Sequence, residues 1–111
     1  MATRKLEKAD WEGYFDRMSK TLTVRTVEIE VGSLAIGDQI AVEWAPLRGL
    51  TYDPKGDLLE VQLAEHDHLI RQPQEIYMVE EADGLAMVET IDGDGVKQII
   101  RLNAPLQLTS A

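Results

Sequence analysis

The chain has 111 residues, of which 44% are hydrophobic, and a formal net charge of -9. This length fits one domain over residues 1–111 and is sufficient to bury a hydrophobic core. The sequence contains no cysteine, which excludes disulfides, thiolate metal sites and cysteine nucleophiles.

The charge is distributed unevenly along the chain. Residues 1–25 carry six Lys or Arg and four Asp or Glu, whereas residues 26–111 carry five and sixteen. Because an acidic body repels phosphate, we expect neither nucleic acid nor a membrane as a partner. No window approaches the ~18 apolar residues of a membrane-spanning helix. Met1–Lys8 lacks the apolar stretch of a signal peptide, so the expected location is the cytoplasm.

The N-terminal region carries an amphipathic helix pattern. Apolar residues recur there at intervals of three and four, namely Trp11, Tyr14, Phe15, Met18 and Leu22. This spacing places them on one face of a helix over about residues 8–22. Gly13 costs ~1 kcal/mol relative to alanine inside a helix, and its presence suggests close packing at that turn. Asp16 and Lys20 on the opposite face have the spacing of an i,i+4 ion pair.

From residue 24 to residue 102 the apolar period changes to two, which predicts a strand-rich body. The expected strands are residues 27–31, 40–44, 50–52, 59–63, 76–80, 86–91 and 96–102. Pro46 should end the second strand or confine it to an edge. Trp44 and Tyr52 are expected to complete the core, while Tyr14 and Tyr77 suit either the core or an exposed patch.

Turn signals connect these strands. Residues 53–57 fit a type I turn between two strands of a hairpin, and the Asp-Gly pairs at residues 92–95 predict a second hairpin. Residues 64–74 show neither period, so we expect a loop there with Leu69 and Ile70 turned inward. The tail over residues 103–111 is expected to fray. The predicted fold is α+β, with the helix packed on a mostly antiparallel sheet of about six strands, curled towards a small barrel as a variant.

Residues able to carry chemistry are few. His66 and His68 would point to the same side of a strand and share a metal, but a polar loop with solvated imidazoles is the simpler interpretation. Tyr52 and Asp53 close one strand of the first hairpin, and the histidines follow its partner strand. The four residues are therefore expected at one end of the sheet, as a candidate small-ligand or metal site.

The remaining pattern favours a binding role. No nucleophile motif or phosphate loop is present, and the paired carboxylates fall at alternating, solvent-facing positions that suit solubility and protection of sheet edges. We assign no catalytic residue and no cofactor. The first hypothesis is a non-enzymatic accessory module that binds a protein partner or forms a homodimer through a sheet face, an edge strand or the helix. The alternative is the ligand or metal site near residues 52–53 and 66–68.

Several longer motifs indicate a family. They are residues 11–20 (WEGYFDRMSK), 27–31 (VEIEV), 37–40 (GDQI), 49–57 (GLTYDPKGD), 67–73 (DHLIRQP) and 92–99 (DGDGVKQI). With these motifs the chain resembles DUF5335, a bacterial family of small uncharacterised proteins, over about residues 4–102. The resemblance implies no activity, cofactor or catalytic residue.

Overall fold

The alternating segments form the strands of one sheet that follows a short helix. The computed structural model describes residues 2–21, 25–33, 37–81 and 84–103. Its elements in chain order are β1 (Ala2–Leu6), the 3-10 turn η1 (Lys8–Asp10), α1 (Trp11–Thr21), β2 (Arg25–Ser33), β3 (Gly37–Asp53), β4 (Leu58–Leu63), β5 (His68–Arg71), β6 (Glu75–Glu81), β7 (Gly84–Ile91) and β8 (Lys97–Leu102).

The sheet is antiparallel throughout its described pairs, as the sequence predicts. It has eight strands in the order β1-β6-β7-β8-β2-β3-β4-β5, so the expectation of about six strands was too low. In the described part of the chain β1 and β5 are the two ends of this order and do not pair with each other. The sheet therefore does not close into a barrel.

The two strands that the sequence analysis missed are both at the edges of the sheet. β1 reads Ala-Thr-Arg-Lys-Leu, and of the side chains that the structure describes on it, Leu6 is the one placed in the core. Charged residues are common on edge strands, since they discourage further pairing. β5 has only four residues, too few to show a period, and its Ile70 is buried while Leu69 is exposed. The prediction of a loop with Leu69 turned inward was therefore wrong.

β3 is a single strand of 17 residues where the sequence predicted two short ones. Its first part, Gly37 to Leu47, pairs with β2. Its last part, Leu47 to Asp53, pairs with β4. Three register shifts bend it, because an extra residue in one strand kinks the ladder. Pro46 does not end this strand, but it lies next to the point where β4 stops pairing.

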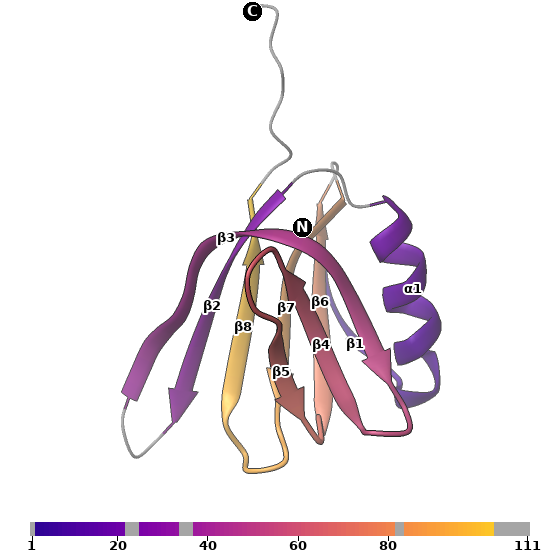
Figure 1. Ribbon diagram of the computed structural model, residues 1–111. Coiled ribbons are helices and arrows are strands. Elements are labelled where there is room, and N and C mark those ends of the chain that lie inside the picture. Colours follow the sequence, from indigo (N-terminus) through magenta and orange to yellow (C-terminus); the bar gives the residue numbers. More distant parts are fainter. Residues whose placement is uncertain (1, 22–24, 34–36, 82–83, 104–111) are drawn as a thin grey trace, which may run out of the picture.

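The bend in β3 folds the sheet over on itself. Figure 1 shows β3 arching over the top of the molecule, with β4 and β5 lying in front of β6 and β7. The backbone N–H of Gly93, in the β7–β8 turn, donates to the carbonyl of Arg71 at 3.1 Å. This bond connects the end of β5 to the layer that contains β7 and β8. The core lies between the two layers, with Leu59, Val61 and Ile70 on one side and Ile76, Met78, Val88 and Ile100 on the other.

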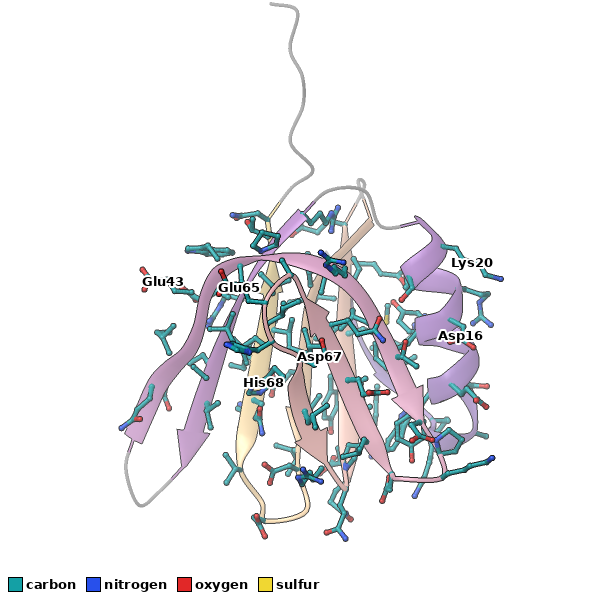
Figure 2. The ribbon with its side chains drawn as sticks, in the orientation of Figure 1. Asp16, Lys20, Glu43, Glu65, Asp67 and His68 are labelled. Atoms are coloured by element: carbon teal, nitrogen blue, oxygen red, sulfur yellow. The ribbon has the colours of Figure 1, made fainter. Side chains whose placement is uncertain are left out.

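The aromatic face of the helix packs into this core, which confirms the predicted amphipathic pattern. Trp11, Tyr14 and Phe15 are buried, and Trp11 stacks edge-on against Tyr52 of β3 at 5.1 Å between ring centroids. Asp16 and Lys20 lie on the outer face of α1, directed away from the sheet (Figure 2). The last predicted member of the apolar face, Leu22, is outside the described residues.

Gly13 lies within α1. A Cβ at Gly13 would meet only Nη1 of Arg17, at 3.2 Å, so close packing against another element does not explain this glycine. At the C-terminal end, Asn103 donates through its backbone N–H to the carbonyl of Thr26 at 2.9 Å. The remainder of the predicted tail is outside the described residues. None of the helices among the described residues has the length and apolar character needed to cross a membrane.

Candidate functional site

Tyr52 and Asp53, predicted as ligand residues, both serve the β3–β4 turn. Tyr52 is buried, and its hydroxyl donates to Oδ1 of Asp57 at 2.6 Å. Burial, together with this hydrogen bond, raises the pKa of Tyr52 to about 12. Oδ1 of Asp53 accepts the backbone N–H of Lys55 at 2.9 Å, which is the local bond that favours aspartate in turns. Both side chains thus have structural partners within the hairpin.

The two histidines occupy different environments. His66 is exposed, whereas His68 is half-buried and points from β5 towards β8 (Figure 2). Nε2 of His68 lies 2.7 Å from Oε1 of Gln98, and Nε2 of Gln98 donates to Oδ2 of Asp92 at 3.0 Å. Because the amide nitrogen of Gln98 is engaged with a carboxylate, its oxygen faces the ring and Nε2 of His68 is the donor.

The four predicted site residues do not form one site. Asp53 pairs with Leu58, the first residue of β4, whereas His66 follows Leu63, the last residue of that strand. They therefore lie at opposite ends of β4, because the chain that leaves a hairpin strand emerges at the end away from the turn. Among the described residues, no group of three or more His, Asp or Glu could hold a metal ion.

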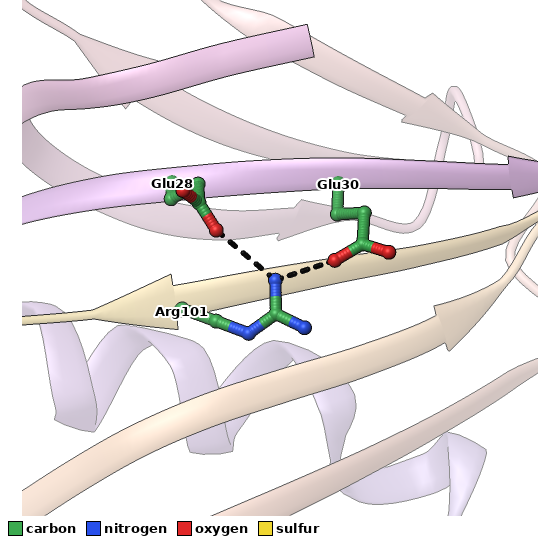
Figure 3. Close-up of polar contacts among 3 residues, drawn as sticks. All are labelled: Glu28, Glu30 and Arg101. Atoms are coloured by element: carbon green, nitrogen blue, oxygen red, sulfur yellow. Dashed lines mark hydrogen bonds and ion pairs between the residues drawn. The ribbon is translucent and has the colours of Figure 1, made fainter. Parts of the chain in front are cut away.

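The outer face of the sheet carries an ion-pair cluster. Nη1 of Arg101 on β8 contacts Glu28 at 3.1 Å and Glu30 at 2.7 Å, both on β2 (Figure 3). The hydrogen bond from Arg101, with a further one from Asp38, holds the pKa of Glu30 below its usual value. The hydrogen bond to Glu30 in turn raises the pKa of Asp38. These contacts join β8, β2 and β3, so their role is to hold the three strands together.

A groove with a mainly apolar lining lies where β4 diverges from β3. It has a volume of about 430 Å³ and is lined by Ala41, Val42, Ala45, Pro46, Leu63, Ala64, Glu65 and His66. The backbone N–H of Ala64 still donates to the carbonyl of Pro46, at 3.2 Å. Beyond that bond the two segments separate. The groove therefore lies beside β3 at the point where β4 no longer runs next to it.

One edge of β3 borders the groove. Over residues 37–45 the described part of β3 pairs with β2 on one side and with no strand on the other. Such an edge presents backbone N–H and C=O groups able to pair with another chain. Two large apolar side chains on this stretch are exposed, Ile40 at 50% and Trp44 at 40%. The predicted core role of Trp44 was therefore wrong.

Trp44 has an unusual backbone conformation. Its φ is 43°, in the left-handed region that bulky residues rarely adopt. Two residues of β3, Glu43 and Trp44, lie opposite the single residue Glu28 of β2 at this bulge. The bulge explains the exposure, because it breaks the alternation that would have turned Trp44 inward. Backbone strain of this kind is concentrated at functional positions.

This surface is not among the sites predicted from the sequence. The alternation over residues 40–44 correctly predicts a strand, but it does not show that one neighbour is missing. Pro46 had indicated an edge as one alternative, because proline is confined to strand edges and bulges, and the structure confirms that alternative. Glu43, a charge of the kind that protects edges, was a further signal.

Comparison with known proteins identifies a family and a relative that the chain matches over almost its full length. A family model described as "Family of unknown function (DUF5335)" matches residues 2–111. An uncharacterized protein of the bacterium Aquifex aeolicus is 46% identical over 109 residues, which cover 97% of this chain and 98% of that protein. No solved structure matches.

Proposed function

Since the chain belongs to the DUF5335 family, whose function is unknown, we propose its role from the surface described above: a cytoplasmic, non-enzymatic interaction module that binds an extended segment of a protein partner. The segment adds to the open edge of β3 and places apolar side chains in the adjoining groove. The single observation that carries this proposal is that the edge of β3 over residues 37–45, which no strand in the described part of the chain covers, coincides with an apolar hollow at its base.

The geometry matches the way in which sheets bind peptides. In β-strand addition, main-chain hydrogen bonds supply affinity and pockets for alternate side chains supply specificity. β4 already occupies the neighbouring position along Leu47–Asp53. A bound segment would continue that line past Pro46, with β2 on the opposite side of β3.

The register limits how long the bound segment can be. Gly37–Ile40 pairs residue for residue with Glu30–Ser33, whereas the bulges follow immediately after Ile40. Bulges interrupt regular pairing, so this edge suits a short segment and resists indefinite strand stacking. That property distinguishes a binding edge from an aggregation site.

Selection from a random peptide library tests the proposal, with Ala41→Gln/Ala64→Gln as the disruptive variant. Both alanines are exposed and line the groove, so the longer side chains fill it without altering the core. Ala9→Gln, at an exposed position on η1, is the matched control. Selected peptides should bind the wild type and the control but lose most of their affinity for the double variant. The proposal is wrong if no peptide is selected, or if the selected peptides bind all three proteins equally.

Tryptophan fluorescence provides a second readout at the same site. The chain has two tryptophans. Trp11 is buried, with its indole N–H donating to the carbonyl of Leu6 at 3.1 Å. Peptide binding at the groove should move the emission of Trp44 to shorter wavelength as water leaves its ring. The shift should disappear in Trp44→Phe and persist in Trp11→Phe, provided that the latter folds.

A further inference from the structure

The charges around the groove define the partner more closely. The two stretches that contain its lining residues, 37–47 and 63–67, carry four acidic residues and no Lys or Arg. They are Asp38, Glu43, Glu65 and Asp67. Figure 2 shows Glu43 on β3, and Glu65 and Asp67 on the connection between β4 and β5. Glu65 lines the groove, and Glu43 and Asp67 each adjoin a lining residue in the sequence. An apolar floor with an acidic rim is complementary to an extended segment in which apolar and cationic side chains alternate.

Three of these acids are free to act on a partner. Glu43, Glu65 and Asp67 are exposed, and none of them forms an ion pair within the part of the chain that the structure describes. By contrast, Glu28 and Glu30 on the outer face of the sheet are both paired with Arg101. The remaining rim acid, Asp38, is already hydrogen-bonded to Glu30.

We infer that the segment bound at the open edge of β3 belongs to a partner protein and carries Lys or Arg side chains that face Glu43, Glu65 and Asp67. This inference rests on the proposed function and names the chemistry of its partner. Arg48, exposed and two residues beyond Pro46, is the nearest cation along β3 and lies on the part already paired with β4. It therefore bounds the acidic rim at one end.

A second copy of this chain fits the same edge poorly. Antiparallel pairing of β3 with β3 would bring two acidic rims together, and like charges facing each other across strands are destabilising. The bulges at both copies would also have to match in register. A cationic partner meets neither obstacle.

Labelled peptides of ~8 residues test the inference. One alternates valine with lysine, a second valine with serine, and a third valine with glutamate. Their affinities are measured by fluorescence anisotropy in low salt and in about 1 M salt. In low salt the lysine peptide should bind on the order of tenfold more tightly than the serine peptide, and the glutamate peptide most weakly. This difference should nearly vanish in high salt, because screening removes interactions between exposed charges.

A charge-neutralised variant assigns the effect to the rim. Glu43→Gln/Glu65→Gln/Asp67→Asn should remove the preference for lysine and leave the affinity for the serine peptide unchanged. The matched control is Glu7→Gln/Glu12→Gln/Asp16→Asn, which makes the same chemical changes at exposed positions near or on the helix. It should retain the preference.

The measurements distinguish a failure of the cationic partner from a failure of the binding edge itself. If the lysine and serine peptides bind equally in low salt but both lose affinity for Ala41→Gln/Ala64→Gln, the cationic partner is wrong and the binding edge stands. If no peptide responds to Ala41→Gln/Ala64→Gln, the proposed function itself is wrong. Sedimentation that shows a dimer dispersed by the same double substitution would identify a second copy as the occupant and overturn the inference.

Discussion

The hydroxyl of Tyr52 donates a 2.6 Å hydrogen bond to Oδ1 of Asp57 across the β3–β4 turn. This bond connects a buried ring, packed against Trp11, to a residue whose φ of 52° lies in the left-handed region. The contact thereby anchors the turn to the core. It also gives Tyr52, proposed from the sequence as a ligand residue, a structural role.

The ionisation of Tyr52 should contribute to the loss of stability at alkaline pH, together with that of Tyr14, whose pKa is also raised by burial and by its hydrogen bond to Glu80. Its pKa rises from the ordinary value of 10.0 to about 12 in the folded protein. A group with a raised folded pKa contributes stability that is present below the unfolded value and is lost as pH rises through the folded value. The free energy of unfolding should therefore fall between pH 10 and about pH 12.

Tyr52→Phe provides the check by denaturant unfolding. It should destabilise the protein by ~1–2 kcal/mol at neutral pH through loss of the hydrogen bond. It should also flatten the decline of stability at alkaline pH. Tyr77→Phe, at a half-buried position on the outer face, is the control and should cost less at neutral pH. An unchanged alkaline profile in Tyr52→Phe would contradict the assignment.

The same substitution, glycine to alanine, should have opposite effects at two positions. Gly13 is inside α1, where alanine is favoured by ~1 kcal/mol, and the nearest atom to a new Cβ is the flexible end of Arg17. Gly95 lies in the β7–β8 turn with a φ of 79° and has no atom within 4 Å of a new Cβ. Gly13→Ala should therefore stabilise the protein, whereas Gly95→Ala should destabilise it by ~1 kcal/mol through backbone strain alone. Equal signs in thermal unfolding would refute this account.

The Arg101 cluster should be visible in carboxyl titrations followed by NMR. In the wild type, Glu30 should titrate below and Asp38 above the ordinary range. Glu30 contributes stability that is lost as pH falls through its lowered pKa, whereas Asp38 contributes stability that is lost as pH rises through its raised pKa. Arg101→Gln should raise the pKa of Glu30, because it removes the principal hydrogen bond to that carboxylate. Arg4→Gln, which contacts Glu80 instead, should leave the titration of Glu30 unchanged.

The two histidines should differ in their contribution to stability. His68→Ala removes the donor to Oε1 of Gln98, a residue only 7% exposed, and should cost ~1–3 kcal/mol because a buried acceptor is left unsatisfied. His66→Ala, at an exposed position, should stay within ~0.5 kcal/mol of the wild type. A double-mutant cycle between His68→Ala and Gln98→Ala should show coupling of about 1 kcal/mol. Additive single effects would mean that the bond contributes nothing.

The sequence by itself determined those features that depend on neighbouring residues. The intervals among Trp11, Tyr14 and Phe15 correctly predicted the buried face of the helix, and alternation predicted β2, β4, β6, β7 and β8. The turn residues at 53–57 and 92–95 placed both hairpins. These signals are local, because side-chain period and turn conformation are set within a few residues.

Only the tertiary structure decided which strands far apart in the sequence are neighbours and which edge has none. β1 pairs with β6, 70 to 78 residues away, and no local period encodes such a partner. β3 changes its set of partners near Pro46, so the same strand is covered at Tyr52 and open at Ile40. The alternation around Trp44 indicates a strand but cannot report a bulge or a missing neighbour, because both depend on pairing with distant segments. The proposed binding edge therefore became apparent only in the fold.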